Sequence, residues 1–139
     1  MKNKRLAFFI TLCIIAVVFW RFRPISLVPV SCDYLRINPS DSKAFDIADI
    51  NSTQKISNLL TSTTYYKSMR TLGKDGPPDH LWAIIELFAD DEEVLEAWIL
   101  LRNENNFGLY IPNSQLLAKD PATIGEYVKE IIESQTETN

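Results

Sequence analysis

The chain offers few side chains of the kinds that enzymes use for catalysis. Its single histidine, His80, follows Asp79 and comes shortly after Asp75. A histidine beside a carboxylate can act as a general base in hydrolysis, so a hydrolase-like enzyme would have to use His80. The spacings H-x-x-x-H, C-x-x-C and G-x-S-x-G do not occur in the sequence, and a lone histidine is more often structural than catalytic. The sequence therefore predicts a protein without catalytic residues.

One run of acidic residues is the second concentration of reactive groups. Ca²⁺ takes oxygen ligands, but the run lacks the D-x-D-x-D-G spacing of a calcium loop. Like charges at a hairpin tip are typical of a solvated turn that prevents edge-to-edge pairing. The glycines do not form a phosphate-binding loop before a helix, so we expect no metal and no cofactor. The run consists of Asp90, Asp91, Glu92 and Glu93.

Aromatic side chains are frequent in the same part of the chain. If helices cover one face of a sheet, the other face must find a cover or expose aromatic residues that can anchor a partner. We therefore expect an interaction surface made of aromatic and acidic side chains. The candidate partner-binding residues are Trp82, Trp98, Tyr110, Asp90, Asp91, Glu92 and Glu93.

The N-terminal segment is the clearest feature of the sequence. Residues 6–20 are apolar or weakly polar, with cations on both sides. A cleaved signal peptide would need small residues before the cut, but Arg21, Arg23 and Pro24 stand there. Fifteen helical residues span about 22 Å of a bilayer core of about 30 Å, and flanking cations and Trp20 can close that gap at the headgroups. We expect a retained transmembrane signal-anchor rather than a cleaved signal or a buried core helix.

Charge predicts the orientation and the kind of partner. Residues 1–23 carry five cations and no acid, whereas the rest holds 9 cations against 18 acids, a formal charge of −9. The basic tip favours a single-pass protein of the cell membrane with its N-terminus in the cytoplasm and its body extracytoplasmic. An acidic body disfavours nucleic acid and suits a basic partner. Cys13 lies in the span and Cys32 beyond it, so no disulfide is expected.

The rest of the chain indicates one small α+β domain at residues 33–134, between an extended stalk at 24–32 and a disordered tail at 135–139. A helix over about 52–62 and another over about 121–133, with Asp120 as N-cap, show apolar residues at helical spacing. Gly125 within the second helix indicates a close approach to a strand. The expected strands are 34–38, an extended segment at 45–50, and an antiparallel meander over about 81–111. Within the meander, residues 91–102 also fit a helix with an acidic first turn.

The sequence thus predicts a non-enzymatic, membrane-anchored, extracytoplasmic protein-binding module. The lipid bilayer would bind residues 6–20, and the body would bind another protein. An immunity or inhibitor-type protein and an accessory subunit of an envelope complex are two versions of this function. The arrangement resembles that of many bacterial envelope proteins, but it carries no motif and transfers no residue roles. A small-ligand-binding domain, or an enzyme that uses His80, is the alternative.

Overall fold

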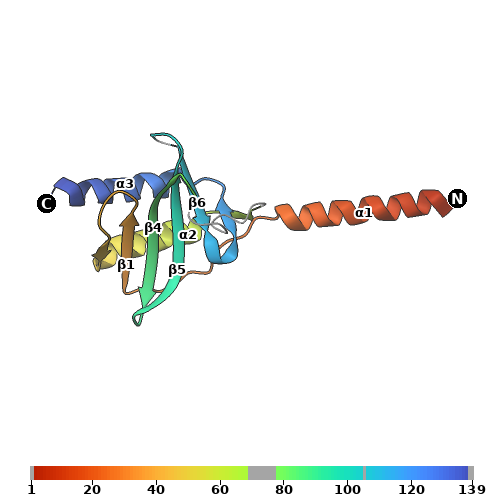
Figure 1. Ribbon diagram of the computed structural model, residues 1–139. Helices are drawn as coiled ribbons and strands as arrows, with labels where there is room; N and C mark the ends of the chain where they lie inside the picture. Colours follow the sequence, from red (N-terminus) through yellow and green to blue (C-terminus); the bar gives the residue numbers. More distant parts are fainter. Residues whose placement is uncertain (1, 69–77, 105, 138–139) are drawn as a thin grey trace.

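The computed structural model describes residues 2–68, 78–104 and 106–137. Within these residues it has three α-helices and a seven-stranded antiparallel sheet (Figure 1), which confirms the expected α+β class. The elements are α1 (Lys2–Phe22), β1 (Tyr34–Pro39), β2 (Phe45–Ile47), α2 (Ile50–Ser62), β3 (Tyr65–Lys67), β4 (Leu81–Ala89), β5 (Glu92–Leu101), β6 (Phe107–Ile111), the 3₁₀ turn η1 (Pro112–Ser114), β7 (Leu116–Ala118) and α3 (Ala122–Glu137).

The sheet is built around the long β4–β5 hairpin. Its strand order is β2-β1-β4-β5-β6-β7-β3, so the meander β4-β5-β6 occupies the centre as expected. Residues 92–101 form a strand, not the alternative helix. Alternation decides this, because Ala97 and Ile99 share one face with Ile85 and Leu87 of β4, which a helix could not arrange.

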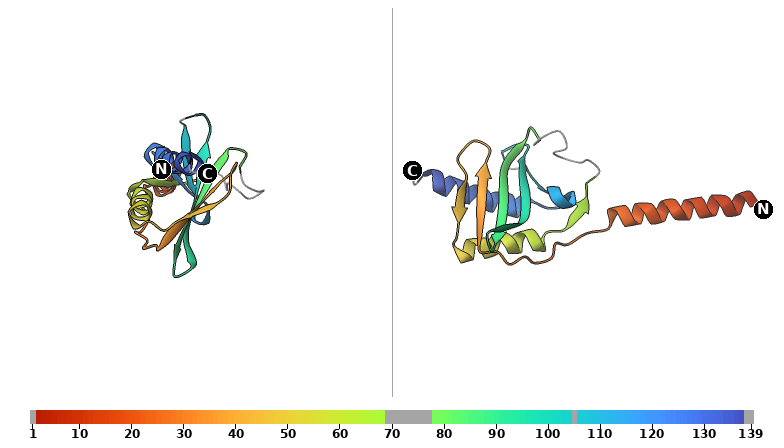
Figure 2. Two further views of the ribbon diagram at one scale, coloured as in Figure 1. Left: turned by 90° about the vertical axis from the view of Figure 1, so that its left-hand side faces the viewer. Right: turned by 60° about the horizontal axis from the view of Figure 1, so that its bottom comes forward.

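The core lies between this face and the helices α2 and α3, which both cover the same side of the sheet (Figure 2, left). The strands contribute one residue in two to it, as a sheet buried on one face requires. We call this side the covered face and the other side the open face. Fully buried residues of the covered face and its helices are Leu35, Ile37, Ala83, Ile85, Leu87, Ala97, Ile99, Leu109, Ile56, Leu60 and Val128.

Both helices of the domain extend beyond their expected bounds. α2 begins at Ile50 rather than near residue 52, because Asp49 is the N-cap and its carboxylate accepts the backbone N–H of Ser52 at 2.8 Å. α3 continues to Glu137, into the segment that we expected to be a tail, because neither glycine nor proline follows Gly125 to stop it. The ammonium of Lys55 on α2 lies 3.6 Å from the ring centroid of Tyr127 on α3, which joins the two helices.

Two short strands were not anticipated. β3 and β7 pair with each other and extend the sheet beyond β6. Each has three residues, too few to show an alternating pattern. Residues 63–66 are β-branched and aromatic, which disfavours a helix there. The partner of β3 lies about fifty residues later, so the pairing leaves no local signal.

The segment 24–32 lies along the domain. Ile25 exchanges two backbone hydrogen bonds of 2.8 Å with Tyr65 at the β3 edge. Further on, the hydroxyl of Ser57 on α2 donates to the carbonyl of Val30 at 2.9 Å. Leu27 and Cys32 pack against the core. This segment therefore attaches the end of α1 to the sheet edge.

The helix α1 projects away from the domain (Figures 1 and 2). Its apolar side chains point outward all around, with Phe8 70%, Phe19 80% and Trp20 65% exposed. The domain therefore leaves the apolar surface of α1 uncovered.

No helix in the described parts of the chain combines the length and the apolar composition needed to cross a lipid bilayer.

Gly125 marks the expected close approach between α3 and the sheet. A Cβ at this position would overlap the ring of Phe107 on β6 and would lie 2.6 Å from its two Cδ atoms. Phe107 is itself buried against the core, with 6% of its surface exposed. The glycine is therefore required by packing, despite its poor helix propensity.

We expect Gly125→Ala to destabilise the domain by about 1–3 kcal/mol through overpacking, although alanine is the better helix former. Thr123→Ala, at an exposed position of the same helix, is the control and should stay within about 0.5 kcal/mol of wild type. The measurement is urea unfolding of the full chain in mild detergent. A more stable Gly125→Ala variant would show that α3 does not rest on Phe107.

Candidate functional site

The open face of the sheet carries a mixed set of aromatic and charged side chains. The strand registers place one row of residues across β2, β1, β4 and β5, namely Asp46, Arg36, Glu86 and Glu96. A second row runs from β1 to β3 on the same face, with Asn38, Ile84, Trp98, Tyr110, Leu117 and Tyr66. Most of these side chains are partly exposed. They form the candidate site.

An aromatic pair borders the first row. The rings of Tyr34 and Phe88 stack with centroids 4.8 Å apart and an interplanar angle of 4°. The guanidinium of Arg36 lies 5.5 Å from the centroid of Phe88 and makes two hydrogen bonds, of 2.7 and 3.1 Å, to the carboxylate of Asp46. These bonds hold the pKa of Asp46 below its usual value. The charge of Arg36 is thereby matched by Asp46.

The carboxylates of β4 and β5 are in excess over the cations of this face. Glu86 pairs across the strands with Glu96, and Glu93 pairs with Phe88. Burial raises the pKa of Glu86, and the negative charge of Glu93 raises it further, against the lowering effect of Arg36. Glu96 accepts the indole N–H of Trp98, which holds that ring in place beside Tyr110, with centroids 6.0 Å apart. The site is an acidic surface with fixed aromatic rings.

The predicted acidic run lies at one end of this surface. Asp90 and Asp91 form the β4–β5 turn with φ of 51° and 63°, the left-handed conformation of a two-residue hairpin turn. Glu92 and Glu93 already belong to β5, so this strand begins two residues earlier than an expected turn at residues 90–93 would allow. The backbone N–H of Asp90 donates to Asp33 at 2.9 Å, so the turn is attached to the start of β1.

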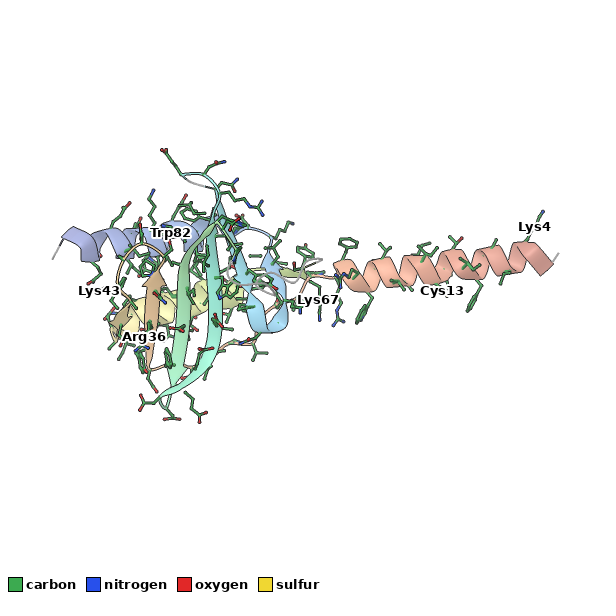
Figure 3. All side chains as sticks on the ribbon, viewed as in Figure 1. Lys4, Cys13, Arg36, Lys43, Lys67 and Trp82 are labelled. Carbon is green, nitrogen blue, oxygen red and sulfur yellow. The ribbon has the colours of Figure 1, made fainter. Side chains whose placement is uncertain are left out.

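Two of the expected aromatic anchors, Trp82 and Tyr110, are not presented on the open face as Trp98 is. Trp82 packs against the core, with its ring 5.8 Å from that of Phe107; Figure 3 labels it near α3. A bulge between Leu81 and Ala83 shifts it from the face that simple alternation would give. Tyr110 lies on the open face but is fully buried, and its hydroxyl has no hydrogen-bond partner among the described residues. Trp98 is thus the anchor that the open face presents.

Part of the histidine site that the enzyme alternative would need lies outside the described residues. His80 lies in the turn before β4, where its carbonyl accepts the N–H of Leu101 at 2.9 Å. Asp75 lies outside the described residues. Among the residues that are described, no group of three potential metal ligands converges.

A hollow of about 360 Å³ separates α2 from residues 29–32 and is lined by Cys32, Gln54 and Ser57. Burial raises the pKa of the Cys32 thiol, which keeps the thiol protonated and unreactive.

Comparisons of the chain with protein-family models, with curated protein sequences and with solved structures found no significant match. The function must therefore be argued from the residues of the open face and of α1.

Sequence reasoning missed several residues of the site. Tyr34, Arg36, Phe88, Glu86 and Glu96 were not singled out, although β1 and β4 were expected as strands. Their signal was available, because an alternating strand whose one face is apolar defines the residues of its other face. The cross-strand neighbours could not be found, since they depend on the register.

The raised pKa of Glu86 predicts a pH dependence of stability. The folded state holds the proton of Glu86 more tightly than the unfolded chain, so the stabilising contribution of Glu86 is fully present below the ordinary pKa of 4.5. It declines as the pH rises through the raised folded value. Unfolding of wild type and Glu86→Gln from pH 4.5 upward should show that the variant gains relative stability as the pH rises. Glu126→Gln, an exposed charge on α3, should follow wild type; parallel curves for all three proteins would contradict the prediction.

Proposed function

We propose that this protein is a non-enzymatic binding module, attached to a membrane by α1, that recognises a basic segment of another protein on the open face of its sheet. The observation that carries the proposal is the excess of carboxylates beside fixed aromatic rings on a face that α2 and α3 leave uncovered. Cationic side chains bind such surfaces through ion pairs and through the faces of aromatic rings.

Charge complementarity supports a basic partner. The carboxylate of Asp46 is engaged by Arg36, whose charge also acts on Glu86. Glu86, Glu93 and Glu96 form no salt bridge among the described residues. Each of the three would gain an opposite charge from a bound Lys or Arg. Trp98 lies in the second row beside Ile84, where a partner's side-chain stem would pack. Indole rings of this kind are frequent anchors in protein interfaces.

The exposed apolar surface of α1 supports a lipid environment. Cations precede the apolar run and Arg21 and Arg23 follow it, so both ends can reach the headgroups by snorkelling, which extends the reach of a short span. The excess of cations at the N-terminal end favours the cytoplasm for that end and the extracytoplasmic side for the domain. In this proposal the module acts at the cell surface, as an immunity or inhibitor-type protein or as an accessory subunit of an envelope complex.

The proposal predicts that a hepta-arginine peptide binds the open face. Fluorescence anisotropy of a labelled peptide, titrated with the full chain in mild detergent, should show binding that weakens as salt is added. The double substitution Glu86→Gln with Glu96→Gln should weaken it by about two- to fivefold for each charge, as partly exposed ion pairs do.

The matched control changes two carboxylates on the other side of the domain, Glu126→Gln with Glu130→Gln on α3, which are both exposed. These should leave the affinity within about twofold of wild type. An equal loss in both double variants would mean that the peptide responds to net charge alone, and the open face would lose its claim to be the site.

A second prediction concerns α1. The full chain, transferred from detergent to phosphatidylcholine vesicles, should float with them in a density gradient. Ile10→Lys with Ile14→Lys should abolish flotation, since a lysine at the centre of a bilayer costs about 3 kcal/mol. The control is Val28→Lys with Ile50→Lys, which also replaces two exposed apolar residues but outside α1. Flotation of the α1 variant would refute a role of α1 in lipid binding.

A further inference from the structure

A small group of cations gathers where α1 meets the domain. Arg21 and Arg23 follow the apolar run of α1, and Lys67 ends β3, which contacts α1. Arg23 and Lys67 are exposed, and Arg21 is partly buried. We call these three residues the basic collar. Trp20, which favours the interfacial region of a bilayer, immediately precedes it.

Hydrogen bonds to backbone groups in and beside β3 hold the collar against the domain. The guanidinium of Arg21 donates to the carbonyl of Ser68 at 3.0 Å. Four residues later, Ile25 pairs with Tyr65 on β3 through two hydrogen bonds. These contacts on both sides of Arg23 fix the end of α1 against the last strand of the sheet. The orientation of the domain relative to α1 is thereby restricted.

The strands follow one another side by side along the direction in which α1 leaves the domain (Figure 1). β3 is the strand at the α1 end of the sheet and β2 is the strand at the far end. Lys67 accordingly lies at the end of the domain next to α1, and Lys43 lies at the opposite end (Figure 3). The position of a strand in this order therefore indicates how far it would lie from the membrane that α1 would enter.

The carboxylates of the open face are remote from the collar on this scale. β5 and β4, which carry Glu93, Glu96 and Glu86, are three and four strand spacings from β3, or about 14–19 Å at about 4.8 Å per strand. This exceeds a Debye length of about 8–10 Å at physiological ionic strength. An anionic surface at the β3 end would therefore attract the collar without strong repulsion from the acidic face.

We propose that the basic collar binds the anionic headgroups of the bilayer that α1 enters, so that the β3 edge of the sheet rests on the lipid surface. This inference rests on the proposed lipid binding of α1. The strands then run along the membrane surface, and the open face presents its carboxylates well above it. A partner must reach that height, as an extended basic segment of a membrane protein or a soluble basic protein would.

The test compares two lysines of the same molecule. The full chain is reconstituted in phosphatidylcholine vesicles, with or without phosphatidylglycerol, and briefly methylated with formaldehyde and dimethylamine–borane, which are uncharged reagents. Mass spectrometry then gives the modification rates of Lys67 and Lys43. A headgroup bound to Lys67 stabilises its ammonium, so phosphatidylglycerol should slow Lys67 by about fivefold relative to Lys43. High salt should remove the difference.

The outcomes separate this inference from the one on which it rests. A chain that does not float with phosphatidylcholine vesicles would refute the proposed role of α1. A chain that floats, but whose ratio of Lys67 to Lys43 modification is the same in both lipids, would refute the collar alone. The double variant Arg21→Gln with Arg23→Gln, in vesicles containing phosphatidylglycerol, should restore part of the reactivity of Lys67; unchanged protection would also contradict the collar.

Discussion

Burial of the alternating apolar residues of β4 and β5 beneath α2 and α3 is the interaction on which the rest of the structure depends. It selects which side of every strand faces the core, because a shift of one residue would turn all of these side chains to the other face. Gly125 allows α3 to come close enough to Phe107 to complete this layer. The composition of the open face follows from this, since the residues between the buried ones must lie there, and they include aromatic and acidic side chains.

The sequence predicts the central part of this fold because its signals are local. The apolar alternation of β4 and β5 and the apolar stripes of α2 and α3 each lie within one segment. The three-residue strands β3 and β7 carry too few residues for a pattern, and their pairing is decided by contacts distant in the sequence. The bulge that turns Trp82 toward the core is equally undetectable in the sequence, because counting alternate residues assigns Trp82 to the other face.

The candidate site was predictable in kind but not in membership. Composition and the acidic run indicated an aromatic and acidic surface, and Trp98 lies on it. Tyr110 lies on the same face but is buried. Glu86 and Glu96 lie opposite each other because of the register between β4 and β5, which the sequence alone does not reveal. Charge is also distributed along the molecule, with cations beside α1 and carboxylates on strands farther from it. This polarity joins the two proposals, since one end of the domain suits a lipid surface and the open face suits a basic protein.

The measurement that tests the central claim most directly places a photoreactive benzoylphenylalanine at Asn38, an exposed position on the open face, in the full chain within intact cells. The matched protein carries it at Thr123, which is exposed on α3. The account predicts one discrete protein adduct from position 38 that is absent from position 123. An adduct from position 123 alone, or the same adducts from both positions, would contradict recognition by the open face.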